Sequence, residues 1–174
     1  MANNCYYDMK VVGEPKAVQE FIRCMRRDGE FENDGLGRVF DCEVYEDNYT
    51  DKETEIKGCA FIAGDCAWSV KCSMMKEYIN WRSLESETAR LDLCVEVFSE
   101  ELGMEFQEHI IVDKGIVMLD DSVDVEEFCL DDLDEEEIKE LTERFGITRE
   151  QLFEEAEEGY YKHGGYANFG EFTI

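Results

Sequence analysis

The sequence predicts an α+β fold, in which an antiparallel sheet with two helices is followed by an acidic helical segment. Three observations support this prediction. Apolar residues make up 44% of the 174 residues and aromatic residues 12%, whereas a disordered acidic chain lacks such aromatic content. Residues 1–119 alternate between strand-like and helix-like patterns of apolar residues. The chain contains 44 acidic and 17 basic residues, and the excess of acid is greatest after residue 119.

The N-terminal region predicts a strand and then a helix. Residues 5–12 alternate loosely in polarity, as expected for a strand. Pro15 suits the first turn of a helix, because the N–H that proline lacks has no intrahelical partner there. Apolar residues recur at helical spacing over residues 17–25, and Gly29 ends the predicted helix.

A long connection and a strand hairpin are expected next. Residues 30–57 are polar and contain glycines, with one short strand candidate at residues 39–45. Residues 59–62 and 66–72 then predict the two arms of a hairpin, joined by the glycine-containing turn at Gly64. Period-two spacing in the second arm places four side chains on one face, pointing into the core: Cys66, Trp68, Val70 and Cys72.

A second helix and a second hairpin complete this region. Helical spacing predicts a helix over residues 87–102, ended by Gly103. Its apolar stripe consists of Leu91, Val95, Phe98 and Leu102. Residues 104–112 then predict a strand, and the Asp-Lys-Gly sequence at residues 113–115 turns the chain back into residues 116–119.

Strand, helix, strand hairpin, helix and strand follow each other as in the ferredoxin-like β-α-β-β-α-β plan. Particular residues strengthen this reading: the opening Asn3-Asn4-Cys5-Tyr6, the Gly13-Glu14-Pro15 start of the first helix, and Ala67-Trp68-Ser69-Val70. With these features, residues 1–119 resemble the YubB-type ferredoxin-like family of phages and plasmids. The resemblance implies an origin in a mobile genetic element. Because no catalytic residues are established for that family, the resemblance assigns none to this chain. The second tryptophan-rich segment that is usual in the family is not clearly present here.

The acidic segment after residue 119 predicts two helices. The first begins near Asp134 and ends at Gly146, with an apolar stripe of Ile138, Leu141 and Phe145. Thr148 and Gln151 have the spacing of a capping box, which opens a second helix that runs to Gly159. The two helices form an acidic helical hairpin with one apolar seam and a charged outer face.

The C-terminal tail contains three aromatic residues, Tyr166, Phe169 and Phe172. Aromatic side chains of this size are usually buried, so the tail is expected to return to the main sheet, as a possible C-terminal strand. The sequence therefore predicts a ferredoxin-like core over residues 1–119, with the acidic hairpin and tail over residues 120–174 packed on that core.

Little in the sequence favours an enzyme or a metal site. His109 and His163 are the two histidines, and P-loop, G-x-S-x-G and H-E-x-x-H motifs are absent. The eight cysteines include no C-x-x-C pair, so they are expected to be reduced and mostly buried. EF-hand loops beginning at Asp120, Asp131 or Asp132 all lack the glycine required at the sixth position. Loose binding of a divalent ion stays open, and no cofactor is expected.

Charge is the strongest functional signal. Residues 120–158 contain 18 acidic and three basic residues, a net charge of −15, out of −27 for the whole chain. This charge repels nucleic acid but suits a protein that binds where nucleic acid would bind. The predicted partner-binding residues are Asp131, Asp132, Asp134, Glu135, Glu136, Glu137, Glu140, Glu143, Glu150, Glu154, Glu155, Glu157 and Glu158.

Two hypotheses follow from this pattern. In the first, the protein is an inhibitor of the anti-CRISPR or antirestriction type, which occupies the basic nucleic-acid channel of a CRISPR effector nuclease or restriction enzyme. In the second, it is a non-catalytic accessory domain that binds a protein partner through its sheet face, and the acids only keep it soluble. Both predict a cytoplasmic protein of the bacterial host, because no export signal and no membrane-spanning apolar stretch is visible.

Overall fold

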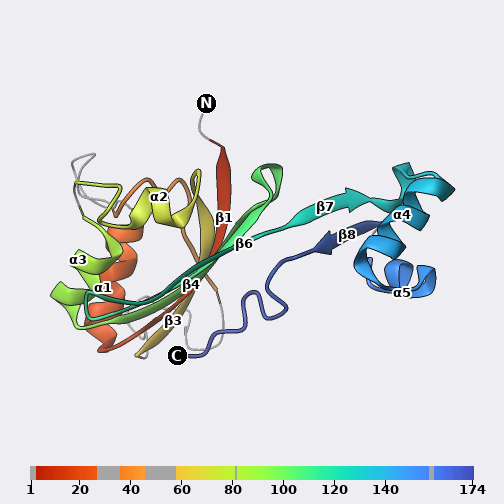
Figure 1. Ribbon diagram of the computed structural model, residues 1–174. Coiled ribbons are helices and arrows are strands. Elements are labelled where there is room, and N and C mark those ends of the chain that lie inside the picture. The colour runs from red at the N-terminus through yellow and green to blue at the C-terminus, as the bar shows by residue number, and fades with distance from the viewer. Residues whose placement is uncertain (1–2, 27–35, 46–57, 81, 157–158) are drawn as a thin grey trace.

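The protein is a mixed α+β structure with a six-stranded antiparallel sheet and a smaller lobe beside it (Figure 1). This computed structural model describes residues 3–26, 36–45, 58–80, 82–156 and 159–174. In the described chain the sheet has the order β2-β3-β1-β4-β5-β6. Its strands are β1 (Asn4–Val12), β2 (Glu43–Tyr45), β3 (Cys59–Ala67), β4 (Cys94–Glu101), β5 (Phe106–Asp113) and β6 (Ile116–Asp124). The α+β prediction is confirmed.

Three helices cover one face of this sheet, namely α1 (Pro15–Met25), α2 (Val70–Met74) and α3 (Leu84–Leu91) (Figure 1). Alternate residues of β1, including Tyr7, Met9 and Val11, have no exposed surface because they point toward these helices. Phe21 of α1 is equally buried. The strand at residues 5–12 and the helix beginning at Pro15 are as predicted, while Gly29 lies outside the described residues.

The predicted hairpin over residues 59–72 is wrong, because the chain runs straight through Gly64 as the single strand β3. A Cβ at Gly64 would lie 2.1 Å from the carbonyl oxygen of Asp41, so glycine is needed there for a close backbone approach rather than for a turn. The chain turns later, at Trp68, and Ser69 then caps α2 by accepting a hydrogen bond from the Cys72 N–H. Trp68 is 45% exposed instead of pointing into the core.

The predicted helix over residues 87–102 is also wrong. Helix α3 ends at Asp92, which adopts the left-handed conformation with φ 56°, and the chain continues as strand β4. Both faces of β4 are covered, so Val95 and Val97 are buried beneath the helices while Glu96 and Phe98 are buried on the opposite face. A strand buried on both sides lacks polar alternation, and its apolar residues mimic helical spacing. Because a hairpin and a helix are both replaced, the ferredoxin-like topology is not confirmed.

The second predicted hairpin is present. Strands β5 and β6 pair antiparallel on either side of a turn in which Lys114 has φ 49° and Gly115 has φ 86°. Strand β6 continues to Asp124, so the predicted domain boundary after residue 119 falls inside a strand.

The lobe that follows β6 contains a two-stranded sheet of β7 (Glu126–Cys129) and β8 (Tyr160–His163), with α4 (Glu135–Phe145) and α5 (Arg149–Glu154). A short 3-10 helix, η3 (Leu130–Asp132), precedes α4 in this lobe, and another, η2 (Leu102–Met104), precedes β5 in the main body. The Asp134 cap, the Gly146 stop and the Thr148–Gln151 capping box are as predicted, although α5 ends before Gly159. Figure 1 shows this lobe projecting from the main body.

The C-terminal tail returns to the main sheet, on the face opposite the helices, but not as a strand of that sheet. The C-terminal strand of the chain, β8, pairs with β7 instead. The tail packs through side chains: the rings of Tyr166, Phe169 and Phe172 lie 6.0, 5.4 and 5.8 Å from the ring of buried Phe98. Aromatic burial and hydrogen bonds from the tail backbone to Glu96 and Gln107, rather than strand pairing, hold the tail in place.

Candidate partner-binding surface

The acidic helices rest on a small core of their own. Leu130, Ile138, Leu152 and Tyr161 are buried together, and Leu152 has no exposed surface. Around them the ring of Phe145 stacks on that of His163, with centroids 3.8 Å apart, and lies 5.7 Å from the ring of Tyr161. This packing fixes the position of α4 and α5, and therefore of the carboxylates that they display.

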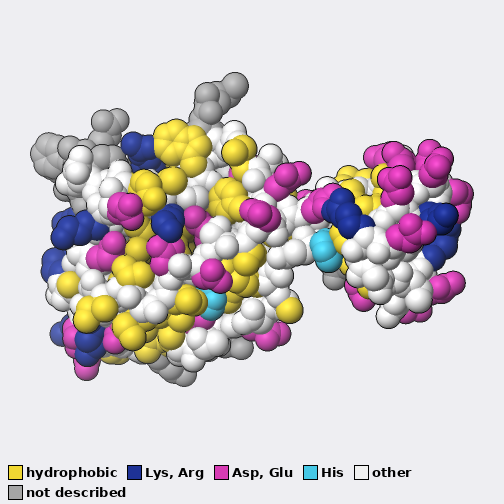
Figure 2. All heavy atoms as spheres, in the orientation of Figure 1, with side chains coloured by type: hydrophobic (Ala, Val, Ile, Leu, Met, Phe, Trp, Pro, Cys, Tyr) yellow, Lys and Arg dark blue, Asp and Glu magenta, His cyan; other side chains and the backbone are white. Residues whose placement is uncertain are grey.

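All eleven described members of the predicted partner-binding set are exposed. They are Asp131, Asp132, Asp134, Glu135, Glu136, Glu137, Glu140, Glu143, Glu150, Glu154 and Glu155. Glu157 and Glu158 lie outside the described residues. Figure 2 shows acidic side chains over much of the visible surface of the lobe, with a few basic side chains among them.

Several of these acids have a local structural role. The Asp134 carboxylate accepts hydrogen bonds from the N–H groups of Glu136 and Glu137, and Glu137 in turn accepts from the Asp134 N–H at 2.8 Å. Glu135 pairs with Arg149, which lowers the pKa of the Glu135 carboxyl mainly through their hydrogen bonds. These contacts join the start of α4 to the start of α5 and do not need a partner.

Five other acids have no such role. Within the described residues, no hydrogen bond or ion pair is formed by the side chains of Asp132, Glu136, Glu140, Glu150 and Glu154. Their charge is therefore available to a basic partner. Lys139, Arg144 and Arg149 are the basic residues of α4 and α5, too few to neutralise the acids around them.

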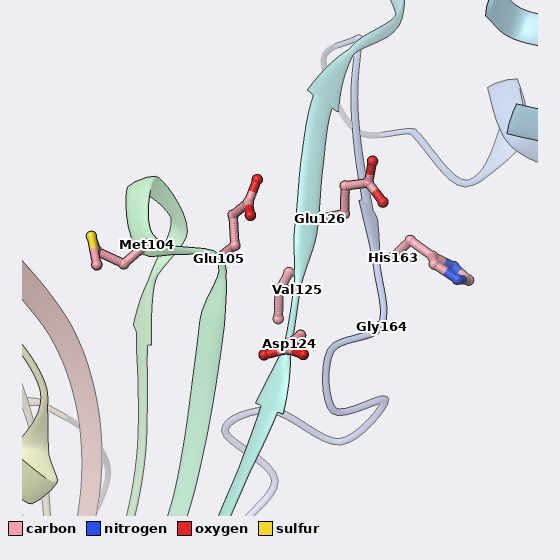
Figure 3. A pocket seen from close by; sticks show the side chains of 7 residues that line it. All are labelled: Met104, Glu105, Asp124, Val125, Glu126, His163 and Gly164. Carbon is pink, nitrogen blue, oxygen red and sulfur yellow. The ribbon is translucent and has the colours of Figure 1, made fainter.

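A hollow of about 600 Å³ lies where the lobe joins the main body (Figure 3). Met104 and Glu105 lie on one side of it, His163 and Gly164 on the other, and between them the chain passes from the end of β6 to the start of β7 through Asp124, Val125 and Glu126. Among the residues that the structure describes, no group of three or more acids, cysteines or histidines is placed to hold a metal ion. Three of the lining residues, Glu105, Asp124 and Glu126, make the hollow acidic.

The histidines and cysteines have structural surroundings. His109 contacts the fully buried Glu96 beneath the tail, and His163 is stacked on Phe145. Burial raises the pKa of the Cys42 thiol to about 11 and also raises that of Cys24, which keeps both thiols protonated at neutral pH. Every helix in the described ranges is too short or too polar to cross a bilayer.

In comparisons with protein-family models, with curated proteins and with solved structures, no match to the chain is found.

Proposed function

We propose that the protein is a non-catalytic inhibitor, which binds the basic nucleic-acid-binding surface of a host defence nuclease by mimicking nucleic acid. The target class is a CRISPR effector nuclease or a restriction enzyme. One observation supports this above all: eleven predicted binding acids are exposed on a lobe that projects from the main body. Nucleic-acid channels in such enzymes are positively charged and recognise a dense row of phosphates.

The concentration of acids on the lobe reduces its stability. Like charges crowded on α4 and α5 repel each other and destabilise the folded lobe. The lobe compensates with two capping boxes, the Glu135–Arg149 pair and a stacked aromatic core around Phe145. A surface that only kept the protein soluble would not require acids concentrated on one lobe, since dispersed charges do so without this repulsion.

The inferred origin in a phage or plasmid belongs to the same proposal. Its support is the resemblance of residues 1–119 to the YubB-type ferredoxin-like family, through the Asn3-Asn4-Cys5-Tyr6 opening and the Trp68 segment. A mobile element benefits from a protein that blocks host nucleases, so origin and surface charge agree. The protein would then act in the cytoplasm of the bacterial host.

The proposal is tested by competition. Purified host CRISPR effector nucleases and restriction enzymes are mixed with a fluorescent DNA duplex, and the full-length protein is titrated into each mixture. Displacement of the duplex together with loss of cleavage by at least one nuclease is the expected result. Cleavage unaffected by excess protein across the panel, with only acidic metabolic enzymes captured from host lysate, would contradict the proposal.

A pair of variants tests whether the lobe is the contact. The lobe variant replaces four free acids by Gln: Glu136, Glu140, Glu150 and Glu154. The control variant removes the same charge from exposed sites on the main body and tail: Glu14, Glu43, Glu77 and Glu171. Gln is about as helix-forming as Glu, and the four control sites are exposed and lie outside the helices, so both variants should fold. The lobe variant should bind at least about tenfold more weakly than the control, mainly through slower association.

The second candidate is an accessory domain that binds a partner through its sheet. The central strands β1 and β4 are covered on both faces, by helices on one side and by the tail on the other. This candidate is supported by the edge strand β6, which is exposed and apolar at its start. Its residues Ile116, Val117 and Met118 are 65%, 40% and 64% exposed. Long apolar edges accept an added strand. If the lobe variant and the control variant both bind the partner as tightly as the wild type, this candidate is favoured.

A further inference from the structure

A groove of about 420 Å³ opens on the helix side of the main sheet, beyond the start of α2. Its large apolar lining residues are Trp68, Met104 and Phe106. Trp68 and Met104 are 45% and 60% exposed. Large apolar side chains that line one open groove together mark a binding surface more often than scattered exposed ones do.

The polar lining of the groove is acidic. Glu108 is 5% exposed, and its Oε2 already accepts hydrogen bonds from Ser99 Oγ at 2.8 Å and from the Lys71 N–H at 3.3 Å. Asp124 also lines the groove and is exposed, and within the described residues its carboxylate has no hydrogen-bond or ion-pair partner. The groove therefore combines an apolar wall, a buried carboxylate and a free carboxylate.

The groove continues toward the lobe. Met104 and Asp124 also line the hollow at the base of the lobe, to which Glu105 and Glu126 contribute further carboxylates (Figure 3). A partner lying on α4 and α5 could therefore extend along this acidic path into the groove beside Trp68.

Within the chain, the Trp68 ring already contacts a cationic side chain, that of Arg38. The guanidinium carbon of Arg38 lies 4.8 Å from the centre of the ring, within cation–π range. Yet the backbone at Trp68 has φ 63°, a left-handed conformation that disfavours a bulky residue and suits glycine. A tryptophan in this conformation strains the backbone, and its ring, which is 45% exposed, still has surface open to a partner.

We infer that this groove binds an arginine or lysine side chain of the basic partner, as a contact separate from α4 and α5. The inference rests on the proposed function, because it assigns a second site on the same partner. The methylene stem of such a side chain would lie against Trp68 and Met104, while its charged end reaches Asp124. The apolar stem therefore matches the apolar lining of the groove, and the cationic end matches its carboxylates.

Other occupants fit less well. An anion would be repelled by Asp124 and Glu108. A purely apolar side chain would remove Asp124 from water without a partner for its charge. A second copy of this chain would bring another net charge of −27 to the same acidic path. A cationic side chain alone offsets the desolvation of the carboxylate.

The experiment uses a short synthetic peptide of alternating arginine and glycine, and a twin in which citrulline replaces arginine. Citrulline keeps the shape of arginine but has no charge. Binding to the full-length protein is measured by calorimetry, and by Trp68 fluorescence after Trp81→Phe makes Trp68 the sole tryptophan. We expect the arginine peptide to bind and to change Trp68 emission, and the citrulline peptide to do neither.

Two groove variants and one control locate the contact. Trp68→Gly removes the ring while relieving the backbone, so its melting temperature should stay close to that of the wild type. Asp124→Asn removes the free charge, and Glu14→Gln removes one exposed charge elsewhere, from a side chain without a capping hydrogen bond. We expect each groove variant to bind the arginine peptide about tenfold more weakly, and the control less than about twofold.

The inference is overturned if both groove variants bind like the control, or if the citrulline peptide binds as well as the arginine peptide. The outcome separates it from the proposed function. Groove variants that inhibit the nuclease normally, with a lobe variant that does not, would refute the groove and leave the proposed function standing. The reverse result would refute the lobe as the contact surface and retain the groove.

Discussion

Glu96 and His109 are hydrogen bonded on neighbouring strands, with 2.7 Å between Oε1 and Nε2, although the Glu96 side chain has no exposed surface. The tail completes the site, because the N–H groups of Thr173 and Ile174 donate to Glu96 Oε2 at 2.6 and 3.0 Å. Burial alone would raise the pKa of Glu96. These hydrogen bonds, from His109 and from the tail, outweigh burial and lower the pKa below its ordinary value.

The first prediction is that Glu96 stabilises the fold in a pH-dependent way. A carboxyl whose pKa is lowered on folding contributes stability above its unfolded pKa, and this contribution is lost as the pH falls through the folded value. We expect Glu96→Gln to reduce the free energy of unfolding by about 1.5–3 kcal/mol at neutral pH. Chemical denaturation of both proteins at neutral pH and at about pH 3 measures this. A difference between them that stays the same at both pH values would contradict the assignment.

The second prediction concerns the tail. Truncation after Gly164 would uncover Phe98 and leave the Glu96 carboxylate without its backbone donors, so we expect a loss of at least about 3 kcal/mol. Phe172→Ala keeps those donors and removes one ring that lies 5.8 Å from both Phe61 and Phe98. It should therefore cost about 2 kcal/mol. Thermal melts followed by circular dichroism test both. A truncated protein that melts like the full chain would show that the tail adds little.

The sequence predicts local features well where one residue type decides the structure. Pro15, the Asp134 cap and the Gly146 stop all mark helix ends correctly, because each acts on its own neighbouring backbone groups. The turn at Gly115 is correct for the same reason. The eleven described acids are exposed as expected, since an uncompensated charge is rarely buried.

Features that depend on contacts between residues far apart in the chain cannot be predicted from local sequence patterns. Gly64 indicates a turn when only its neighbours are considered, but its backbone lies against that of Asp41. Strand β4 has helix-like spacing because Phe98 is buried under a tail more than 60 residues further along. The sequence does not predict the Trp68 groove, because period-two spacing places Trp68 in a strand with its side chain in the core. Ser69 is the signal for the correct structure, since serine is a favoured N-cap residue and here begins helix α2.

The third prediction tests whether the lobe is a cooperative unit with its own core. Leu152 has no exposed surface and packs with Ile138 and Tyr161. Leu152→Ala should destabilise the lobe by about 2–5 kcal/mol. Hydrogen exchange should then accelerate over the described residues of 126–163, while β4 and β5 keep their protection. Equal acceleration in both regions would show that the lobe and the sheet unfold as one.

The last prediction is the salt dependence of partner binding, which separates the two candidate functions. Exposed carboxylates such as Glu140 and Glu154 act on a partner through solvent, where screening operates within about 10 Å at moderate ionic strength. If they drive binding to a nuclease, the affinity should fall at least about tenfold between about 50 and 200 mM salt, mostly through a slower association rate. Strand addition at β6 depends instead on backbone hydrogen bonds and on Ile116 and Met118, which salt does not screen.

Surface plasmon resonance with an immobilised target nuclease measures both rates across this range. The main-body control variant, without Glu14, Glu43, Glu77 and Glu171, should retain nearly the full salt dependence, because its removed charges lie away from the lobe. The lobe variant should lose much of it. If the wild type binds with the same affinity at both salt concentrations, electrostatic mimicry is wrong. The exposed edge of β6 then becomes the surface to mutate, beginning with Met118→Lys.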